Sequence, residues 1–317
     1  MGTSTGDIFG ADAGAEPATP GSYGEPPAGH RLPATTRLGE VRLQVADLAR
    51  SVDYYTTVLG LRVVGEGDET MLAAHDDDRP LVALRERPGA RPMARRGRLG
   101  LYHFAILLPD RASLGRFLRH LAERGARAGA ADHLVSEALY LTDPDGLGIE
   151  IYADRPREAW RRVGRELMMA TDPLDAEGLV QAAGDAPWRG MPAGTTMGHV
   201  HLHVGDVAAA SRFFHDALGL DRMVWSYPGA LFLAAGGYHH HLGTNTWAGP
   251  GAVPPSEGDA RLVEWTIELP DAASVDAAAR ALAAAGHEAT ADAGGVVARD
   301  PWGTAVRLRA VDGRSAT

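Results

Sequence analysis

The feature that most constrains the fold of this chain is an internal repeat. The stretch 38–64 (LGEVRLQVADLARSVDYYTTVLGLRVV) matches the stretch 197–224 (MGHVHLHVGDVAAASRFFHDALGLDRMV), and equivalent residues stand 159 positions apart. Each copy alternates apolar and polar residues, reaches Asp47 or Asp206, and continues with an apolar pattern of helical period that ends at Leu-Gly. Alternation predicts a strand, an aspartate before the periodic segment caps a helix, and glycine ends that helix.

A second pair of segments follows the same plan. The stretches 102–125 and 263–286 match with a spacing of 161, and both copies continue to an Asp-Pro-x-Gly turn and a closing strand, in 142–153 and 299–310. The chain therefore holds four strand–helix–strands modules, named here by their residues: module A (37–88), module B (98–154), module C (195–249) and module D (260–311). Each module is too small to bury its own sheet face, so we expect an α+β fold of four βαβββ modules paired into two curved mixed sheets.

The domain organisation expected from this repeat is simple. Residues 37–154 (modules A and B) form a first domain and residues 195–311 (modules C and D) a second, joined by a linker, 155–194, with a short helix near 175–183. Residues 1–36 are predicted to be a disordered tail because the stretch 1–30 is rich in Gly, Pro, Ala and Ser and has no periodicity. Residues 312–317 are a second tail.

Composition excludes several classes of function. With a formal net charge of −10, the chain lacks the basic footprint of a non-specific nucleic-acid binder. It has no apolar run long enough to span a membrane and no secretory signal, so the cytoplasm is the expected location. The absence of cysteine excludes disulfides and thiolate chemistry, and any metal must be bound by His, Asp or Glu.

Potential metal ligands recur at one register. The residue seven positions before the capping aspartate is acidic or a histidine in every module: Glu40, His103, His199 and Glu264. Seven residues after the Asp of the Asp-Pro-x-Gly turn, module B has Glu150 and module D has Arg307. A buried carboxylate between two isoleucines needs a cation or an arginine to compensate it. The preferred site therefore combines two histidines and Glu150, which requires module B to pair with C, and module A to pair with D or with another chain.

Four stretches carry a resemblance to a known family: 100–111 (GLYHFAILLPDR), 135–156 (VSEALYLTDPDGLGIEIYADRP), 198–206 (GHVHLHVGD) and 236–249 (GGYHHHLGTNTWAG). With them the chain resembles the vicinal oxygen chelate superfamily, and within it the two-domain extradiol ring-cleaving dioxygenases of the catechol 2,3-dioxygenase type. The resemblance covers about residues 37–311. It implies cleavage of a catechol next to its diol by O2 at a 2-His-1-carboxylate Fe(II) site, with Mn(II) as the alternative ion.

The resemblance also implies roles for individual residues. His103, His199 and Glu150 would bind the metal. The family uses a tyrosine ten residues before the ligand glutamate, where Tyr140 stands, and a histidine in a His-His stretch before a closing strand, for which His240 fits best. A further family histidine precedes the tyrosine by about nine residues, whereas His133 precedes Tyr140 by seven. The expected catalytic residues are His240, Tyr140 and His133, and the expected substrate-binding residues are His201 and His241. His203, which shares a strand face with His199 and His201, would line the same cleft.

The sequence is also compatible with two other functions on the same scaffold. The metal site could instead use Glu40, Glu264 or His241 as a ligand. A site with Glu40 or Glu264 would suit a glyoxalase- or epimerase-type isomerase with a redox-inert metal and a carboxylate base. A metal-free protein that binds an aromatic compound on the same scaffold is the second alternative. The expected partners are a catecholic small molecule and O2, with no nucleic acid and no membrane, and the chain could form a homo-oligomer through edge strands.

Overall fold

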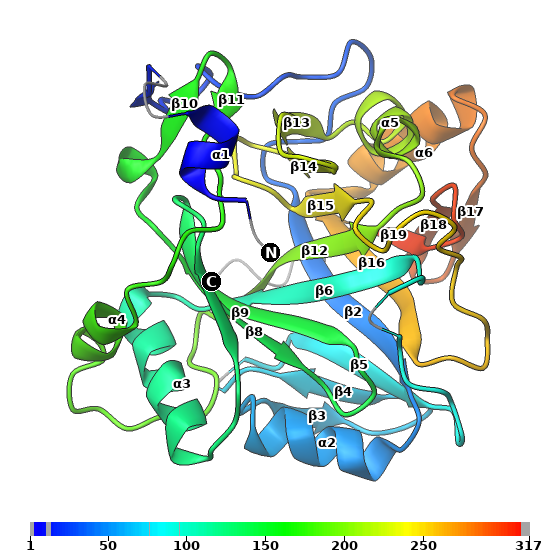
Figure 1. The fold of residues 1–317 in the computed structure, drawn as a ribbon. Coiled ribbons are helices and arrows are strands. Elements are labelled where there is room, and N and C mark those ends of the chain that lie inside the picture. Colours follow the sequence, from blue (N-terminus) through cyan, green and yellow to red (C-terminus); the bar gives the residue numbers. More distant parts are fainter. Residues whose placement is uncertain (1–2, 11–13, 76, 95, 312–317) are drawn as a thin grey trace.

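Two eight-stranded mixed sheets form the framework of the protein (Figure 1). We describe a computed structural model, which covers residues 3–10, 14–75, 77–94 and 96–311. Each sheet combines one module from each half of the chain, and we call them the BC sheet and the AD sheet after their modules. The fold class expected from the repeat is confirmed.

The BC sheet has the strand order β13-β14-β15-β12-β6-β9-β8-β7. Its centre is an antiparallel pair of opening strands, β12 and β6, and each of these pairs in parallel with the closing strand of its own module, β15 or β9. The strands are β6 (Gly100–Leu107), β7 (Gly129–Asp132), β8 (Ser136–Thr142), β9 (Gly148–Asp154), β12 (Thr196–His203), β13 (Asp221–Val224), β14 (Ala230–Ala234) and β15 (Leu242–Asn245).

The AD sheet repeats this plan in the order β17-β18-β19-β16-β2-β5-β4-β3. Its opening strands β16 and β2 form the central antiparallel pair. The strands are β2 (Arg37–Val45), β3 (Arg62–Gly65), β4 (Thr70–Ala73), β5 (Pro80–Glu86), β16 (Arg261–Leu269), β17 (Ala289–Asp292), β18 (Gly295–Arg299) and β19 (Ala305–Ala310).

This pairing corrects the expected domain organisation. Residues 37–154 and 195–311 are not each one sheet, because modules A and B lie in different sheets, as do C and D. The alternating pattern is similar in all four opening strands, so it specifies which face of a strand is buried without specifying its partner strand. The pairing of B with C is the one that the preferred metal site requires, and A pairs with D.

One helix follows the opening strand of each module, as predicted. These helices are α2 (Leu48–Thr57), α3 (Arg111–Glu123), α5 (Val207–Ser211), which continues as the π-helical segment η2 (Arg212–Ala217), and α6 (Ala272–Ala284). The aspartate before each helix accepts a hydrogen bond from the backbone N–H three residues later. Such a cap stabilises a helix by about 1 kcal/mol. The apolar side chains between the helices and the two sheets form one continuous hydrophobic core. In this core Tyr55 of α2 stacks on Phe104 of β6.

The predicted disorder of residues 1–36 is wrong for the described part of that segment. Residues Thr5–Phe9 form α1, and β1 (Glu16–Pro17) joins a small sheet with β10 (Arg161–Val163) and β11 (Glu166–Leu167). Tyr23 and Leu32 are buried, and Arg31 forms a two-point ion pair with Asp221. The segment lies along the surface of a sheet and is held there by single anchoring residues. Its sequence therefore has no helix or strand periodicity.

The linker contains η1 (Arg157–Ala159) and α4 (Ala176–Ala182), and α4 confirms the short helix expected near 175–183. The predicted tail 312–317 lies outside the described residues. Among the described helices, none has the length and apolar character needed to cross a membrane.

Candidate metal centre

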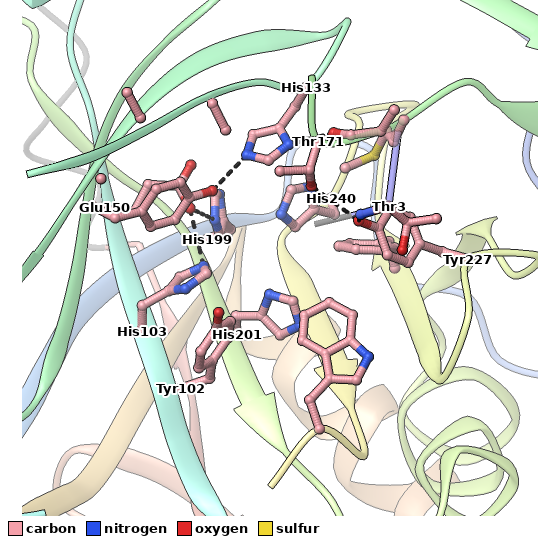
Figure 2. Close-up of a pocket in the computed structure, with 18 residues that line it drawn as sticks. Thr3, Tyr102, His103, His133, Glu150, Thr171, His199, His201, Tyr227 and His240 are labelled. Atoms are coloured by element: carbon pink, nitrogen blue, oxygen red, sulfur yellow. Dashed lines mark hydrogen bonds and ion pairs between the residues drawn. The ribbon is translucent and has the colours of Figure 1, made fainter. Parts of the chain in front are cut away.

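Three neighbouring strands of the BC sheet bring His103, His199 and Glu150 together. His199 lies on β12, His103 on the adjacent β6 and Glu150 on β9, the next strand. One ligand atom of each residue lies within 4.8 Å of the others. The Nε2 atoms of His103 and His199 are 3.0 and 3.2 Å from the same carboxylate oxygen, Oε2 of Glu150 (Figure 2).

The electrostatics of the cluster suit a cation. All three side chains are buried. Burial lowers the pKa of His199 to about 4, although Glu150 acts in the opposite direction. For Glu150 burial acts to raise the pKa, but His199 and His103 hold it well below its usual value. Near pH 7 the cluster therefore offers a neutral imidazole and a carboxylate anion, the protonation states in which these groups bind metals.

The donor set fits a divalent transition metal. Two imidazoles and one carboxylate on one side of an ion leave positions open for other ligands, as in non-haem Fe(II) oxygenases. Within the described residues, the Nε2 atom of His103 and the Nδ1 atom of His199 are buried without a hydrogen-bond partner. His103 Nε2 thus lies at ion-pair distance from the Glu150 carboxylate but forms no hydrogen bond with it, and an ion bound between the three side chains would satisfy its lone pair.

The cluster forms part of the wall of a cavity of about 430 Å³ (Figure 2). This size lies within the range of small-molecule sites. Among the expected site residues, Tyr140, His133, His201 and His240 also line it. The rest of the lining is largely apolar and aromatic, with Thr3 from the N-terminal segment: Tyr102, Gly129, Ala130, Ala131, Met169, Ala170, Thr171, Tyr227, Phe232 and Trp247.

Tyr140 and His133 form a hydrogen-bonded pair beside the cluster. Tyr140 lies on β8, directly opposite Glu150 on β9. His133 Nδ1 lies 2.6 Å from the carbonyl oxygen of Ala170, which can only accept, so Nδ1 carries the proton and Nε2 accepts from the Tyr140 hydroxyl at 2.5 Å. Burial raises the pKa of Tyr140 well above its usual value, which keeps the hydroxyl protonated.

The turn that presents His133 is strained. Leu134, the next residue, has φ of 68°, the only positive value at a non-glycine among the described residues. A leucine in this left-handed region costs about 1–2 kcal/mol. The Leu134 N–H donates to Asp132, which helps to hold the turn.

Two of the three alternating histidines on β12, His201 and His203, are held by one amide that the sequence analysis missed, Asn245. The backbone N–H of Trp247 and Nδ1 of His203 both donate to Oδ1 of Asn245, so its Nδ2 donates to Nε2 of His201 at 2.9 Å. Burial lowers the pKa of both histidines. His201 lines the cavity, whereas His203 is not among the lining residues. Asn245 is the last residue of β15. The alternating sequence pattern gave no sign that this strand end differs from the others.

The three histidines 239–241 divide between two sides of the chain. His240 lines the cavity, and its ring centroid lies 4.0 Å from that of His199. The structure does not bring His241, expected to bind substrate, into the cavity: its Nδ1 accepts the backbone N–H of Ala235, and its ring lies beside Tyr238. Of these two neighbours, therefore, only His240 reaches the cavity.

The alternative ligands Glu40 and Glu264 lie in the AD sheet and are held by arginines. Arg307 contacts Glu264 at 2.6 and 3.0 Å, and Arg309 contacts Glu40 at 3.1 and 2.8 Å. A carboxylate neutralised by a guanidinium in two-point geometry has no free charge for a metal. The expectation of a metal site that uses Glu40 or Glu264 is therefore corrected.

Comparison with known proteins agrees with this fold. Residues 37–151 and 196–308 match the family model described as Glyoxalase/Bleomycin resistance protein/Dioxygenase superfamily. The chain is 45% identical over 256 residues to the catechol-2,3-dioxygenase of Bacillus subtilis (strain 168), covering 80% of this chain and 89% of that protein. It is 30% identical over 124 residues to biphenyl-2,3-diol 1,2-dioxygenase 2 of Rhodococcus globerulus, covering 39% of this chain and 65% of that protein.

Two solved structures show the same architecture. A crystal structure of a protein from Bacillus subtilis subsp. subtilis str. 168 superposes with a TM-score of 0.61 at 14% identity, covering 89% of this chain and 86% of that chain. A mutant of glyoxalase I from Zea mays superposes with a TM-score of 0.50 at 18% identity, covering 86% of this chain and 92% of that chain. At these identities the likeness concerns the fold alone.

Proposed function

Because the chain belongs to the glyoxalase/bleomycin resistance protein/dioxygenase superfamily, we propose that it is an extradiol dioxygenase, which uses O2 to cleave a catechol or substituted catechol next to the diol. The observation that carries this proposal is the convergence of His103, His199 and Glu150 on one point of a cavity wall. The 45% identity to a catechol-2,3-dioxygenase over most of the chain supports the same activity.

In this proposal His103, His199 and Glu150 hold Fe(II), with Mn(II) as the alternative ion. A bound metal of this kind supplies the electron transfer by which O2 reacts with a diol. The protein contributes geometry: the three strands fix the ligands on one side and leave the cavity side open. The cavity wall around the ligands is largely apolar and aromatic, which limits the number of water molecules that can bind beside the reactants.

The remaining polar groups of the cavity act on the substrate hydroxyls. His240 would take a proton from an incoming diol hydroxyl at a ring nitrogen, which leaves that diol oxygen negatively charged. The Tyr140 hydroxyl donates a hydrogen bond to His133, so the hydroxyl oxygen is free to accept a hydrogen bond from a substrate hydroxyl. The hydrogen bond from Asn245 fixes the orientation of the His201 ring, which gives one wall of the cavity a polar side chain in a fixed position. The aromatic side chains Tyr102, Phe232 and Trp247 enclose the ring and its substituents.

Metal analysis combined with turnover tests the proposal. Protein purified without oxygen and loaded with Fe(II) should convert catechol in air into a yellow ring-opened aldehyde, with about one iron per chain. His199→Ala should lose both iron and turnover. His75→Ala is the matched control, since His75 is an exposed histidine in a loop of the AD sheet, and it should change neither.

Two outcomes would overturn the proposal. Isomerase activity with Ni(II) or Co(II) in the absence of O2, without ring cleavage by the iron form, would assign a glyoxalase-type reaction instead. Tight binding of an aromatic compound by a protein that retains no metal and cleaves no catechol would assign a binding protein.

A further inference from the structure

A line of hydrogen bonds runs from the rim of the BC sheet to the cavity through Asp154, His239 and His240. Oδ1 of Asp154, at the end of β9, lies 2.9 Å from Nε2 of His239. Nδ1 of His239 lies 2.7 Å from Nδ1 of His240. His239 is fully enclosed and His240 faces the cavity, so the line connects a partly exposed carboxylate to the cavity wall.

The protons along this line can be assigned from what each atom can do. A carboxylate oxygen only accepts, so Nε2 of His239 donates to Asp154. A neutral imidazole carries one N–H, so Nδ1 of His239 is an acceptor and His240 donates to it from Nδ1. The remaining nitrogen of His240, Nε2, then carries a bare lone pair. It makes no hydrogen bond with the described residues of the chain.

The reverse assignment requires a charged His239. With protons on both nitrogens, His239 would donate to His240, whose proton would then lie on Nε2. That arrangement places a full positive charge on a ring with no exposed surface, which is costly.

The carboxylate end of the line is itself oriented. The Tyr238 hydroxyl donates to Oδ1 of Asp154 at 3.2 Å, so the Tyr152 hydroxyl, 2.6 Å away, donates to Tyr238. Tyr152 in turn passes so close to the chain before His199 that a Cβ at Gly198 would lie 1.8 Å from its hydroxyl oxygen. Only glycine fits at 198, which ties the strand that carries His199 to the residues that orient Asp154.

We propose that Asp154 and His239 are positioning residues that fix the tautomer of His240, so that its Nε2 lone pair points into the cavity as the acceptor for a substrate hydroxyl. This inference rests on the proposed function, because it assigns a partner to His240 in that reaction. A carboxylate that sets the tautomer of a histidine through a hydrogen bond has a precedent in hydrolytic triads, where the amide variant holds the wrong tautomer.

The experiment measures the tautomer directly. The ¹⁵N chemical shifts of the histidine ring nitrogens in the full-length protein, metal-free and loaded with diamagnetic Zn(II), distinguish Nδ1–H from Nε2–H. In the wild type we expect His240 as Nδ1–H. In Asp154→Asn the amide can donate to Nε2 of His239, which reverses the line and leaves the proton of His240 on Nε2.

Kinetics of the iron-loaded protein give the second readout. Asp154→Asn should lower kcat by about 100-fold or more, the range of a lost general base, while KM changes less and iron content stays at the wild-type level. His239→Phe, which keeps a ring but removes the acceptor, should have the same effect. Asp221→Asn is the control, a buried, arginine-paired aspartate outside the cavity, for which we expect kcat within about threefold of wild type.

The outcomes separate this inference from the proposed function. An Nε2–H tautomer of His240 in the wild type, or a wild-type kcat in both variants, would overturn the positioning role even if catechol is cleaved. An Nδ1–H tautomer that reverses in Asp154→Asn would support the role, and it would do so even in a protein that cleaves no catechol.

Discussion

Arg307 and Glu264 form a two-point ion pair at the place in the AD sheet that corresponds to Glu150 and His103 in the BC sheet. The register is the same: Glu150 pairs with the residue two after His103, and Arg307 pairs with the residue two after Glu264. The guanidinium of Arg307 in the AD sheet thus takes the place that the carboxylate of Glu150 has in the BC sheet. The repeat has kept its architecture in both sheets, while among the described residues only the BC sheet gathers three side chains that could hold a metal ion.

The ion pair gives a first prediction. Arg307→Met should destabilise the fold by about 2 kcal/mol or more, because it leaves the largely buried carboxylate of Glu264 without its main partner. Urea unfolding followed by fluorescence measures this loss. Iron content and kcat should stay at wild-type values, and a loss of iron in this variant would contradict the separation of the two sheets.

The metal centre predicts a linkage between metal and stability. At a free metal concentration about 100 times Kd, binding to the folded state should stabilise it by about 2.7 kcal/mol. Chelation should therefore lower the melting temperature of the wild type, measured by calorimetry. Glu150→Gln keeps the shape of the ligand but removes its charge, so its melting temperature should respond little to chelation. An equal response in both proteins would exclude Glu150 as a ligand.

The sequence could predict those parts of the site that depend on residues close together in the chain, but not those that depend on sheet pairing. The capping aspartates and the seven-residue register are local, so they identify the modules, place His103 and His199 at equivalent points of two opening strands, and place Glu150 on a closing strand before any pairing is known. Asn245 and Asp154 could not be found in this way. Each acts on a residue brought near it only by sheet pairing or by a loop, and side chains of their type are common at strand ends.

The pairing of Tyr140 with His133 predicts a kinetic effect without loss of metal. Tyr140→Phe removes the hydroxyl that donates to His133 and faces the cavity, and should lower kcat by roughly 10- to 100-fold. Stopped-flow measurement of product formation, with iron measured in the same sample, tests this. Tyr54→Phe is a suitable control because Tyr54 lies on α2, away from the cavity; an equal loss in both variants would argue for a general structural effect.

The buried aspartate of the last Asp-Pro-x-Gly turn predicts a pH-dependent stability. Burial raises the pKa of Asp300 to about 6 from 3.8, although the N–H groups of Trp302 and Thr304 act in the opposite direction. The folded state therefore binds this proton more tightly than the unfolded state. Its contribution to stability is present below about pH 4 and is lost as the pH rises through 6.

Asp300→Asn isolates that contribution, because the amide oxygen can still accept both hydrogen bonds but no longer titrates. Relative to wild type, the variant should gain up to about 3 kcal/mol of unfolding free energy between pH 4 and pH 7.5. Denaturant unfolding at several pH values measures the difference. A constant difference across this range would show that Asp300 ionises normally in the folded protein.

The N-terminal segment has a practical consequence for anyone who produces this protein. Thr3 lines the cavity, its backbone bonds Thr171 and the Tyr227 hydroxyl, and Thr5 is anchored to Asp172. An affinity tag or fusion partner joined upstream of Thr3 would begin beside the cavity wall, where it can obstruct substrate entry. Kinetic constants are therefore best compared between protein with such a tag and protein from which the tag has been removed.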